Sequence, residues 1–459
     1  MTTTDGAIRE RLEQLYSGFL GAPCEAPVFA SAPGRIELAG NHTDHQGGRT
    51  ISAGLDRRIY ALACPNGKNV CHVWMEGFGQ ADINLDNLDP VPAELNRSAA
   101  LIRGMAAAYA RDGGTPAGFN AVVISDIPVG GGVSSSAAFE VLIGALIRET
   151  APTGWSTANS QPTGTPPVVI LSEGRSPQSK DLSSRGDPST AALRASAQDD
   201  KEGRELCAFR QNNEAFIQLA LHGQFAEGVY FGKPTGAQDQ LASAFGGIVA
   251  LDFFTDPPQV TPVDANFAHS DFALVLIDSR CDHSRFTAQF NSVPADMKRV
   301  AGLFGCDRLV DVPLHNILDQ FAETRTTVGD LAAMRALHFY NETRRVEQQT
   351  QKLQQGRIAE FVQLARESGS SSAMFLQNVS PAGDGLEQDQ PAMVIQSLCA
   401  TLLQADGAWR IHGGGFGGCV LAFVPKEREP EFTSSLNQSL GYEACFPVAI
   451  DPQGLRIER

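Results

Sequence analysis

The segment AVVISDIPVGGGVSSSAAFEVL, residues 121–142, decides the fold of this chain of 459 residues. It opens with the apolar run AVVIS, which is typical of a buried strand, and closes with apolar residues at helical spacing. Between them, Gly130, Gly131 and Gly132 allow a tight turn with free backbone N–H groups. Such a turn before the positive end of a helix favours binding of a phosphate group. A plain strand–turn–helix with capping serines is the alternative.

The bulk composition limits the possible functions. With 459 residues and 42% hydrophobic content the chain can bury two ordinary cores, so we expect two domains. The formal net charge of −16, without any run of Lys or Arg, argues against nucleic acid as a partner. A phosphate-bearing ligand would therefore need a local pocket of backbone N–H groups and a metal ion.

The sequence also indicates a compartment. The first residues, MTTTDGAIRERLEQLY, do not resemble a targeting signal, and no run approaches the ~18 apolar residues of a membrane span. The nine cysteines are scattered without any C-x-x-C pair, which supports neither a disulfide framework nor a zinc ribbon. We therefore expect a cytoplasmic protein in a reducing compartment, with no membrane partner.

Residues 151–205 differ from the sequence on either side. They are dense in Ser, Thr, Pro and Gly, with Trp155 as the only aromatic residue. Such a segment cannot bury enough apolar surface to offset the entropy cost of ordering, so it is predicted to be a disordered insertion. Apolar residues in 137–149 and 213–227 predict helices on both sides, so the insertion lies within one domain.

Strands and helices alternate along the rest of the chain. Apolar runs and helical periodicity predict three strands and a pair of helices, at residues 121–125, 272–277, 419–425, 338–356 and 357–369. Each helix of the pair is expected to end in Gly. The pattern predicts an α+β protein with domains at residues 1–250 and 251–459, and a soft boundary near 246–270.

The segment APGRIELAGNHTDHQGG, Ala32–Gly48, gathers polar side chains of every type around turn-forming glycines. A charged surface loop is the alternative interpretation. A metal site at His42, Asp44 and His45 is disfavoured, because residues so close in sequence point in different directions and no distant ligand stands out.

Two common nucleotide-binding motifs are excluded by their context. The segment HGGGFGGCVLAFV, His412–Val424, contains G-x-G-x-x-G, but a strand follows it where a dinucleotide site requires a helix. The segment GVYFGKPT, residues 228–235, has the wrong glycine spacing for a Walker A loop. A nucleotide site in this chain must therefore be of another kind.

Two carboxylates flank a Gly/Pro turn in AEGVYFGKPTGAQDQLASAFGG, residues 226–247. Glu227 and Asp239 lie twelve residues apart, and a helix is predicted to begin at Asp239. The helix dipole should keep Asp239 ionised and able to accept a proton. An acidic N-cap is the alternative for Asp239, and a plain surface residue is the alternative for Glu227.

In this order the motifs resemble those of the galactokinases in the GHMP kinase superfamily. GRIELAGNHTDHQGG resembles the signature GRVNLIGEHTDYNGG, and PVGGGVSSSAA resembles the phosphate loop P-x-G-x-G-L-S-S-S-A-A. GKPTGAQDQ resembles the family's CGIMDQ, and HGGGFGGC resembles its third motif, GAGFGGC. The match runs from Phe29 to Pro425 apart from the insertion.

The resemblance implies a two-domain GHMP kinase fold, with a ribosomal protein S5 domain 2-like N-terminal half and a ferredoxin-like C-terminal half. It also implies ATP and Mg²⁺ as cofactors, Asp239 as the base that deprotonates the sugar's anomeric hydroxyl, and Arg35 as the group that stabilises the alkoxide. The remaining implied contacts are to the triphosphate (Pro128, Gly130, Gly131, Gly132, Val133, Ser134, Ser135 and Ser136), to Mg²⁺ (Ser135, Ser136 and Glu227) and to the sugar (Asn41, His42, Asp44, Gly236 and Phe290).

Three positions depart from the family pattern. The glutamate of G-E-H-T-D, which binds the sugar's outer hydroxyl in the family, is Asn41 here, so a negative charge is lost. A tyrosine that reaches the axial hydroxyl aligns with Phe290, which can only pack, and the lost hydrogen bond is worth ~0.5–1.5 kcal/mol. Gln238 replaces the methionine before Asp239.

The resemblance predicts a monomeric kinase that forms α-galactose 1-phosphate from ATP. Another hexose or a uronic acid such as galacturonate is an alternative acceptor because of Asn41. A non-catalytic sugar sensor, or a chain inactivated by its insertion, is the alternative from outside enzyme chemistry. Asp239, Arg35 and the intact serine run favour catalysis.

Overall fold

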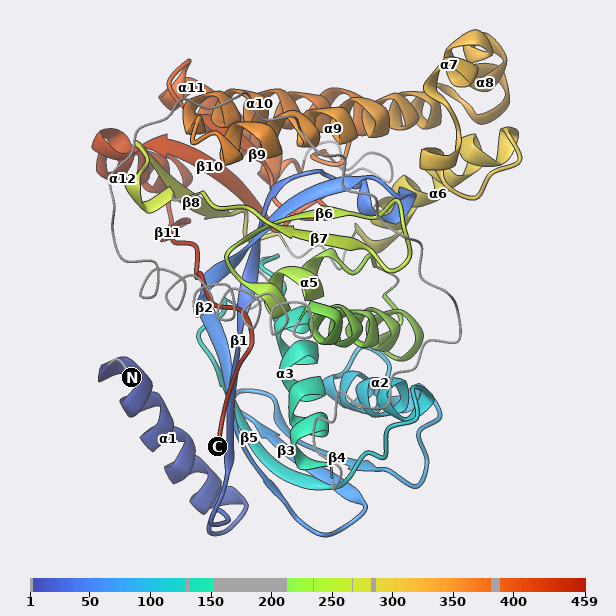
Figure 1. The fold of residues 1–459 in the computed structure, drawn as a ribbon. Helices are drawn as coiled ribbons and strands as arrows, with labels where there is room; N and C mark the ends of the chain where they lie inside the picture. The colour runs from blue at the N-terminus through green and yellow to red at the C-terminus, as the bar shows by residue number, and fades with distance from the viewer. Residues whose placement is uncertain are drawn as a thin grey trace, which may run out of the picture. The chain divides into compact units, whose positions relative to one another are not determined.

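The computed structural model describes residues 3–128, 132–151, 213–233, 235–265, 267–281, 286–380 and 389–459. Residues Met1–Pro152 and Phe216–Arg459 form one compact unit, which holds the elements that follow (Figure 1). The second unit, Thr153–Ala215, falls almost wholly outside the described residues. The predicted disordered insertion therefore lies outside them too, as do Gly130 and Gly131.

The first sheet has eight strands in the order β12-β1-β2-β5-β3-β4, with β6 paired to β2 and β7 paired to β6. Its strands are β1 (Val28–Ala39), β2 (Arg49–Pro65), β3 (Val70–Met75), β4 (Gly79–Asn84), β5 (Phe119–Ser125), β6 (Ile248–Asp252), β7 (Gln259–Pro262) and β12 (Arg456–Glu458). Every pairing is antiparallel except that of β3 with β5. The long strand β2 pairs with β5 over one half and with β6 over the other, so it joins the two parts of the sheet.

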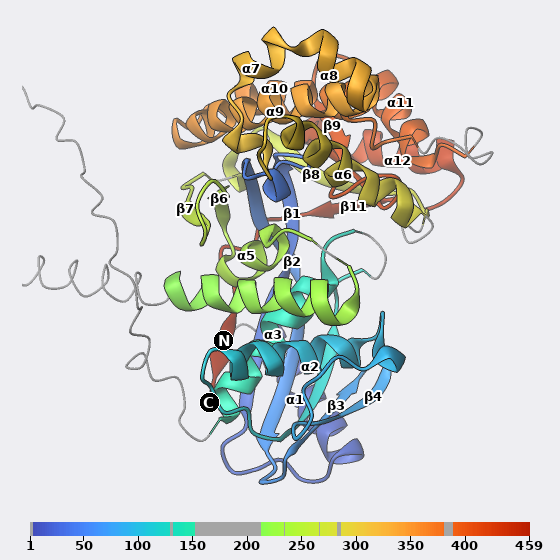
Figure 2. The ribbon, with the colours of Figure 1, turned by 90° about the vertical axis from the view of Figure 1, so that its right-hand side faces the viewer.

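Helices cover both faces of this sheet (Figure 1 and Figure 2). Helix α1 (Thr3–Phe19) packs against Leu62, whereas α2 (Ser98–Arg111) and α3 (Ser135–Thr150) belong to the cluster that contains Ala61. Because neighbouring residues of a strand point to opposite faces, these two clusters lie on opposite sides of β2. The short helix α5 (Gln238–Phe245) follows on the side of α3.

The second sheet has four antiparallel strands in the order β11-β8-β10-β9. They are β8 (Phe272–Asp278), β9 (Ala408–Ile411), β10 (Cys419–Pro425) and β11 (Cys445–Val448). The helices of this half are α6 (Thr287–Leu303), α7 (Leu314–Asp319), α8 (Phe321–Val328), α9 (Asp330–Gln354), α10 (Ile358–Ser371), α11 (Pro391–Leu403) and α12 (Glu429–Leu440).

Alternation along β8 explains how the second sheet is buried. Leu274 and Leu276 join the largest hydrophobic cluster of the molecule, whereas Val275 and Ile277 join a cluster with α11 and α12. The sheet is therefore covered on both faces. Residues 213–225 are also helical. The short 3₁₀ segments are η1 (Asp44–Gln46), η2 (Pro92–Glu94), η4 (Phe267–His269), η6 (Leu309–Asp311) and η9 (Lys426–Arg428), and the π segments are η3 (Ala226–Phe231) and η7 (Ser372–Leu376).

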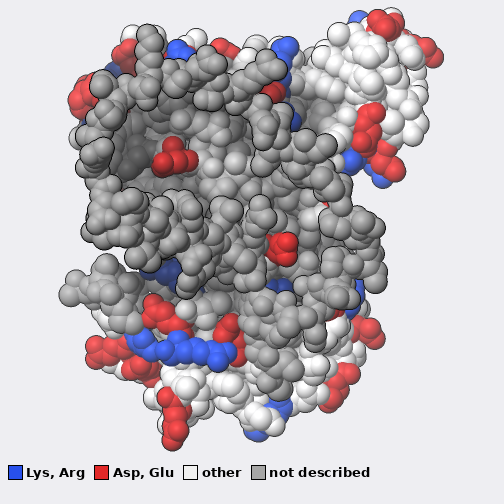
Figure 3. Space-filling model, viewed as in Figure 1, with Lys and Arg blue, Asp and Glu red and all other residues white. Residues whose placement is uncertain are grey.

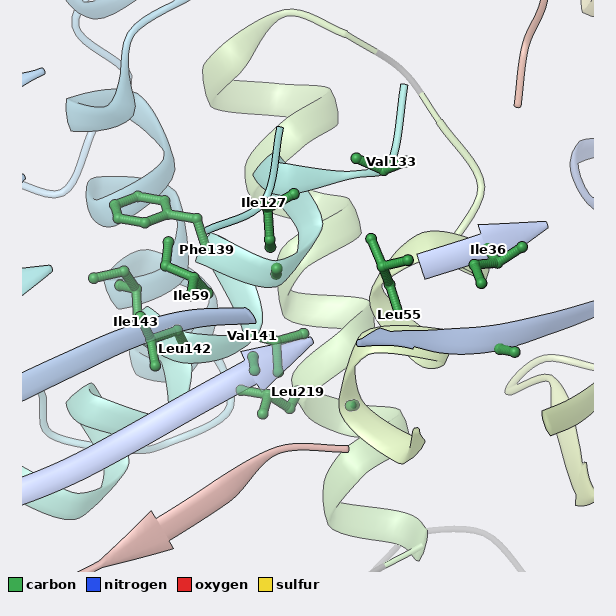
Figure 4. Packing of buried hydrophobic residues seen from close by; sticks show 14 of the residues in the cluster. Ile36, Leu55, Ile59, Ile127, Val133, Phe139, Val141, Leu142, Ile143 and Leu219 are labelled. Atoms are coloured by element: carbon green, nitrogen blue, oxygen red, sulfur yellow. The ribbon is translucent and has the colours of Figure 1, made fainter. Parts of the chain in front are cut away.

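The largest cluster lies beneath the glycine-rich loop. Figure 4 shows Val133 beside Ile127, with Leu55 of β2 nearby. A Cβ added at Gly34 would lie 2.9 Å from the Val133 carbonyl oxygen, so only glycine allows β1 to approach the loop this closely. Burial of this apolar group fixes the described end of the loop on the sheet.

The three predicted strands are confirmed as β5, β8 and β10, and a strand rather than a helix follows His412–Gly418. The helix pair is confirmed as α9 and α10, but the predicted C-terminal end of α10, at Gly369, is wrong. Helix α10 continues through Gly369 to Ser371, and a Cβ at Gly369 would lie 2.3 Å from the Trp409 carbonyl oxygen. Gly369 thus permits packing against β9 and does not end the helix.

The division at residue 250 remains a prediction. Strands β7 and β12 lie beyond that residue in sequence and belong to the first sheet. On the face drawn in Figure 3, basic and acidic side chains of the described residues are interspersed. Among the described residues, no helix combines the length and apolar character needed to cross a membrane.

Candidate active site

Strand β1 carries two charged residues into the interior, Arg35 and Glu37, which are 4% and 5% exposed. The pairing of β1 with β2 shifts register between Pro33 and Arg35 and again between Glu37 and Ala39. Such irregularities bend a strand and re-aim its side chains, and they are common beside active sites. The two shifts bracket both charged residues.

Arg35 and Asp239 form a two-point ion pair. Arg35 Nε donates to Asp239 Oδ1 at 2.6 Å, and Nη2 donates to Oδ2 at 3.2 Å. Burial would raise the pKa of Asp239, but Arg35 and a hydrogen bond from Ser134 outweigh it, so the pKa lies below its usual value. Asp239 is the second residue of α5 and not its cap, which is Ala237. The carboxylate is therefore ionised, as the sequence predicts, and its acidic-cap alternative is wrong.

The described end of the glycine-rich loop meets this pair. Arg35 Nη1 donates to the Gly132 carbonyl at 2.8 Å, and the Arg35 N–H donates to the Val133 carbonyl at 3.2 Å. Ser134, with a left-handed φ of 59°, precedes α3 and donates its hydroxyl to Asp239 Oδ2. The loop, β1 and α5 are thus tied together at one point.

The other loop residues lie as follows. Pro128 is exposed, Val133 is buried, and Ser135 and Ser136 begin α3. The first N–H groups of a helix have no partner within the helix, which makes this end suited to an anion. Ser136 Oγ donates to Glu227 Oε1 at 3.2 Å, so the structure brings two of the three predicted metal ligands together.

Glu227 lies in the π segment η3 and is 2% exposed. Its Oε1 also accepts from Lys233 Nζ at 3.1 Å, and its Oε2 accepts from Thr235 Oγ1 at 2.8 Å and from Gln240 Nε2 at 3.1 Å. π segments in helices are frequent at functional sites. The interpretation of Glu227 as a plain surface residue is wrong.

Sequence analysis missed a second acid behind Glu227. Glu140 of α3 is fully buried, and its Oε2 accepts from Gln240 Nε2 at 2.8 Å. Burial and the charge of Glu227 raise the pKa of Glu140 well above its usual value. Burial beside a second carboxylate thus favours the neutral form of Glu140.

Asp44 and Gly236 lie in contact. A Cβ at Gly236 would lie 1.8 Å from Asp44 Oδ2, so any larger residue would displace the Asp44 carboxylate. Burial raises the pKa of Asp44 to about 6, and the carboxylate of Asp239 adds to the rise. Both predicted sugar contacts thus sit beside the Arg35–Asp239 pair.

Replacing Asp44 with Asn should stabilise the protein at pH 7.5 and not at pH 4. The pKa of Asp44 is raised on folding from 3.8 to about 6, so its stabilising contribution is complete below pH 3.8 and is lost as pH rises through 6. Asparagine does not ionise, so the variant avoids this loss of stability. The loss is about 1–2 kcal/mol once the partial exposure of Asp44 is allowed for. Urea unfolding at both pH values measures the difference.

The control for this prediction is Asp311→Asn, which removes an exposed carboxylate paired with Arg308 at 3.2 Å. It should not stabilise the protein at pH 7.5, because an exposed ion pair contributes only about 0–1 kcal/mol. An Asp44→Asn variant that is less stable than the parent at pH 7.5 would contradict the raised pKa.

His42, His45 and Phe290 pack together on one side of the candidate site. His42 Nε2 donates to the Gly414 carbonyl at 2.8 Å, which leaves Nδ1 to accept from His45 Nε2 at 3.3 Å. Burial lowers the pKa of His42 to about 3 and that of His45 to about 4, so both rings are neutral. The ring of Phe290 lies 5.4 Å from that of His42 and covers Gly414.

Asn41 is fully buried, and its amide is saturated with hydrogen bonds. Its Nδ2 donates to Glu37 Oε1 at 3.1 Å and to the Gly413 carbonyl at 2.7 Å. Its Oδ1 accepts from Ser372 Oγ at 3.2 Å and from Asn378 Nδ2 at 2.7 Å. A sugar hydroxyl could bind Asn41 only by displacing one of these partners. The expected contact stays a prediction.

Glu37 and Arg410 form a buried ion pair that sequence analysis missed. Arg410 Nη2 donates to Glu37 Oε1 at 2.7 Å, and Arg410 is fully buried. Gln238 Nε2 donates to Glu37 Oε2 at 3.3 Å, which explains why a polar residue stands where the family pattern has methionine. The pattern GRVNLIGEHTDYNGG also has asparagine at position 37, so this chain has exchanged the acid and the amide of positions 37 and 41.

His412 is a further residue that sequence analysis missed. Its Nε2 accepts from the Glu37 N–H at 3.0 Å, and its ring nitrogens lie 3.3 and 3.4 Å from Arg35 Nη1. Burial and the charges of Arg35 and Arg410 lower its pKa well below the usual value. A neutral imidazole therefore packs against the Arg35 guanidinium without adding a positive charge.

Two protein-family models match segments that supply residues to this site. The model "Galactokinase galactose-binding signature" matches residues 15–65, which include Arg35, Asn41 and Asp44. The model "GHMP kinases N terminal domain" matches residues 100–160, which include the glycine-rich loop and the start of α3. The chain is therefore similar to the GHMP kinases in both segments. Both matched segments supply residues to the cluster around Asp239.

Curated members of the superfamily resemble the chain over nearly its full length. Galactokinase from Mannheimia succiniciproducens is 24% identical, covering 98% of this chain and 99% of that protein. Galactokinase from Haemophilus influenzae is 23% identical and covers 94% of each chain. Galactokinase from Actinobacillus pleuropneumoniae is 25% identical, covering 90% of this chain and 89% of that protein.

Solved structures confirm the two-domain GHMP kinase fold and the α+β class. Lactococcus lactis galactokinase complexed with galactose superposes with a TM-score of 0.71 at 20% identity, covering 98% of this chain and 99% of that chain. A mevalonate kinase superposes with a TM-score of 0.53 at 13% identity, covering 92% and 98%. At these identities the likeness concerns the fold alone.

Proposed function

We propose that this chain is an ATP-dependent sugar kinase that transfers the γ-phosphate to the anomeric hydroxyl of galactose. The observation that supports it most strongly is the Arg35–Asp239 pair, held by Ser134 at the end of the glycine-rich loop. Phosphoryl transfer requires mainly positioning, charge stabilisation and one group that accepts a proton. Asp239 is ionised and Arg35 is buried beside it.

In this proposal Asp239 accepts the proton of the anomeric hydroxyl, and Arg35 stabilises the negative charge on the attacking oxygen. His412 and the Gly132 carbonyl hold Arg35 in place, at 3.3 and 2.8 Å from Nη1. Asp44 and Gly236 contact the sugar beside Asp239, and the neutral His42 and Phe290 shape the wall of its pocket.

The residues present fit a magnesium nucleotide. Mg²⁺ is usually held by one or two carboxylates together with phosphate oxygens, and bound in this way it neutralises charge on the phosphates. Glu227, Ser135 and Ser136 would hold it, and the backbone from Pro128 to Ser136, including Gly130 and Gly131, would hold the triphosphate. Among the described residues there is no group of three or more His, Cys, Asp or Glu that could hold a metal ion.

The acceptor is tested with a panel of galactose, galacturonate, N-acetylgalactosamine and arabinose in a coupled ATPase assay. We expect the highest kcat/KM with galactose. All hydrogen-bonding positions of the Asn41 amide are used within the protein, and no carboxylate stands at position 41 to bind the outer hydroxyl of the sugar. This favours a second candidate, an acceptor that differs from galactose at the outer hydroxyl. Turnover of another sugar without turnover of galactose would replace the first candidate by the second.

A further inference from the structure

Among the described residues, Lys233 is the one charged side chain that donates to the carboxylate of Glu227. Neither the proposed proton transfer nor the proposed sugar contacts use it. Its Nζ lies 3.1 Å from Glu227 Oε1, and its side chain is 50% exposed. Its backbone N–H donates to the Glu227 carbonyl at 3.0 Å, which anchors the base of the side chain at the same place.

The carboxylate of Glu227 has no capacity left for another partner. A carboxylate offers about four lone-pair sites, and Glu227 accepts two hydrogen bonds on each oxygen, from Lys233 and Ser136 and from Thr235 and Gln240. A metal ion can therefore reach Glu227 only if one donor leaves. Two cations on Oε1 would also repel each other strongly.

Lys233 is the donor that can leave at the lowest cost. Gln240 is fully buried and also binds Glu140, whereas the side chain of Lys233 is half exposed and has four rotatable bonds. Because the carboxylate of Glu227 is only 3% exposed, the ammonium group can leave at low cost only when another cation replaces it on that carboxylate. Once released, the ammonium group remains tethered beside Ser136 at the start of α3, where the proposed function places the phosphates.

We infer that Lys233 binds the nucleotide phosphates as a second cation beside Mg²⁺. In the free protein its ammonium group would be held on Glu227, and on nucleotide binding it would move to the phosphates and leave Glu227 to Mg²⁺. This inference rests on the proposed function. If Lys233 has this role, removing its charge should lower the affinity for the nucleotide and raise the affinity for a metal ion alone. A purely structural ion pair would not change the two affinities in opposite directions.

The test compares Lys233→Met and Lys233→Arg by calorimetric titration with ATP in the presence of Mg²⁺. We expect Lys233→Met to weaken ATP binding at least tenfold, about 1.4 kcal/mol, and Lys233→Arg to stay within threefold of the parent. The matched control is Lys298→Met, which removes the same charge from an exposed pair with Asp307 at 3.8 Å. It should bind ATP as the parent does.

A second titration uses Mn²⁺ without nucleotide, followed by electron paramagnetic resonance. Lys233→Met should bind Mn²⁺ several-fold more tightly than the parent, because Oε1 of Glu227 is free. Unchanged ATP affinity, or unchanged Mn²⁺ affinity, in Lys233→Met would overturn the inference and leave the kinase proposal standing. Failure of the parent to bind ATP would instead overturn the kinase proposal.

Discussion

Replacing Asp239 with Asn should reduce kcat by about 10²- to 10⁴-fold, which is the usual contribution of a general base. Asparagine keeps the shape of the side chain and can still accept one hydrogen bond from Arg35, but it cannot take a proton from a sugar hydroxyl. Measurement of kcat and KM with ATP and galactose, together with the dissociation constant of ATP, separates loss of chemistry from loss of binding. We expect the ATP affinity to change little.

The variant should also be less stable at pH 7. Arg35 lowers the pKa of Asp239 in the folded state, so the carboxylate stabilises the protein above its unfolded pKa and loses this effect as pH falls through the folded value. The difference in unfolding free energy should therefore shrink toward pH 3. Asp252→Asn is the matched control, since it removes a carboxylate paired with Arg49 at 2.8 Å in a partly exposed ion pair. A variant at position 239 with the parent's kcat would exclude Asp239 as the base.

Local patterns were enough to predict the main elements. Apolar alternation and helical spacing depend only on neighbouring residues, so β5, β8, β10 and α9 could be placed from the sequence. The end of α10 could not, because Gly369 is there to allow approach of the Trp409 carbonyl, 40 residues further along the chain. A glycine needed for packing and a glycine that ends a helix look alike in sequence.

The cluster around Asp239 came from resemblance and not from spacing. Arg35 and Asp239 lie 204 residues apart, and no local pattern connects them. Resemblance could say which residues meet, but it gave Asn41 a ligand role without showing its partners, Ser372 and Asn378, which lie 331 and 337 residues away. Burial of an amide among distant partners is a property of the tertiary structure alone.

One available signal was overlooked. Glu37 stands between Ile36 and Leu38 in a run that reads as a buried strand, and a buried acid requires a partner. The family pattern has asparagine at that position and an acid four residues later, so the sequence already showed an exchange of acid and amide. The partner of Glu37, Arg410, lies 373 residues away, and no local pattern connects the two.

Replacing Arg410 with Met should lower the free energy of unfolding by about 3–5 kcal/mol, because it leaves the buried carboxylate of Glu37 without its counter-ion. Methionine fills a similar volume, so loss of packing contributes little. Urea unfolding followed by tryptophan fluorescence measures the effect. Arg325→Met, which breaks an exposed pair with Asp330 at 2.7 Å, should cost far less.

The double variant Glu37→Gln with Arg410→Met distinguishes an unpaired buried charge from lost packing. Removing both charges should recover most of the stability that Arg410→Met loses, because a buried ion pair replaced on both sides is often neutral. The single variant should also recover as pH falls, because its Glu37 pKa, already raised by burial, rises further without Arg410, and the acid becomes neutral. A penalty that is equal at pH 5 and pH 8, and that persists in the double variant, would show that Arg410 acts by packing and not by charge.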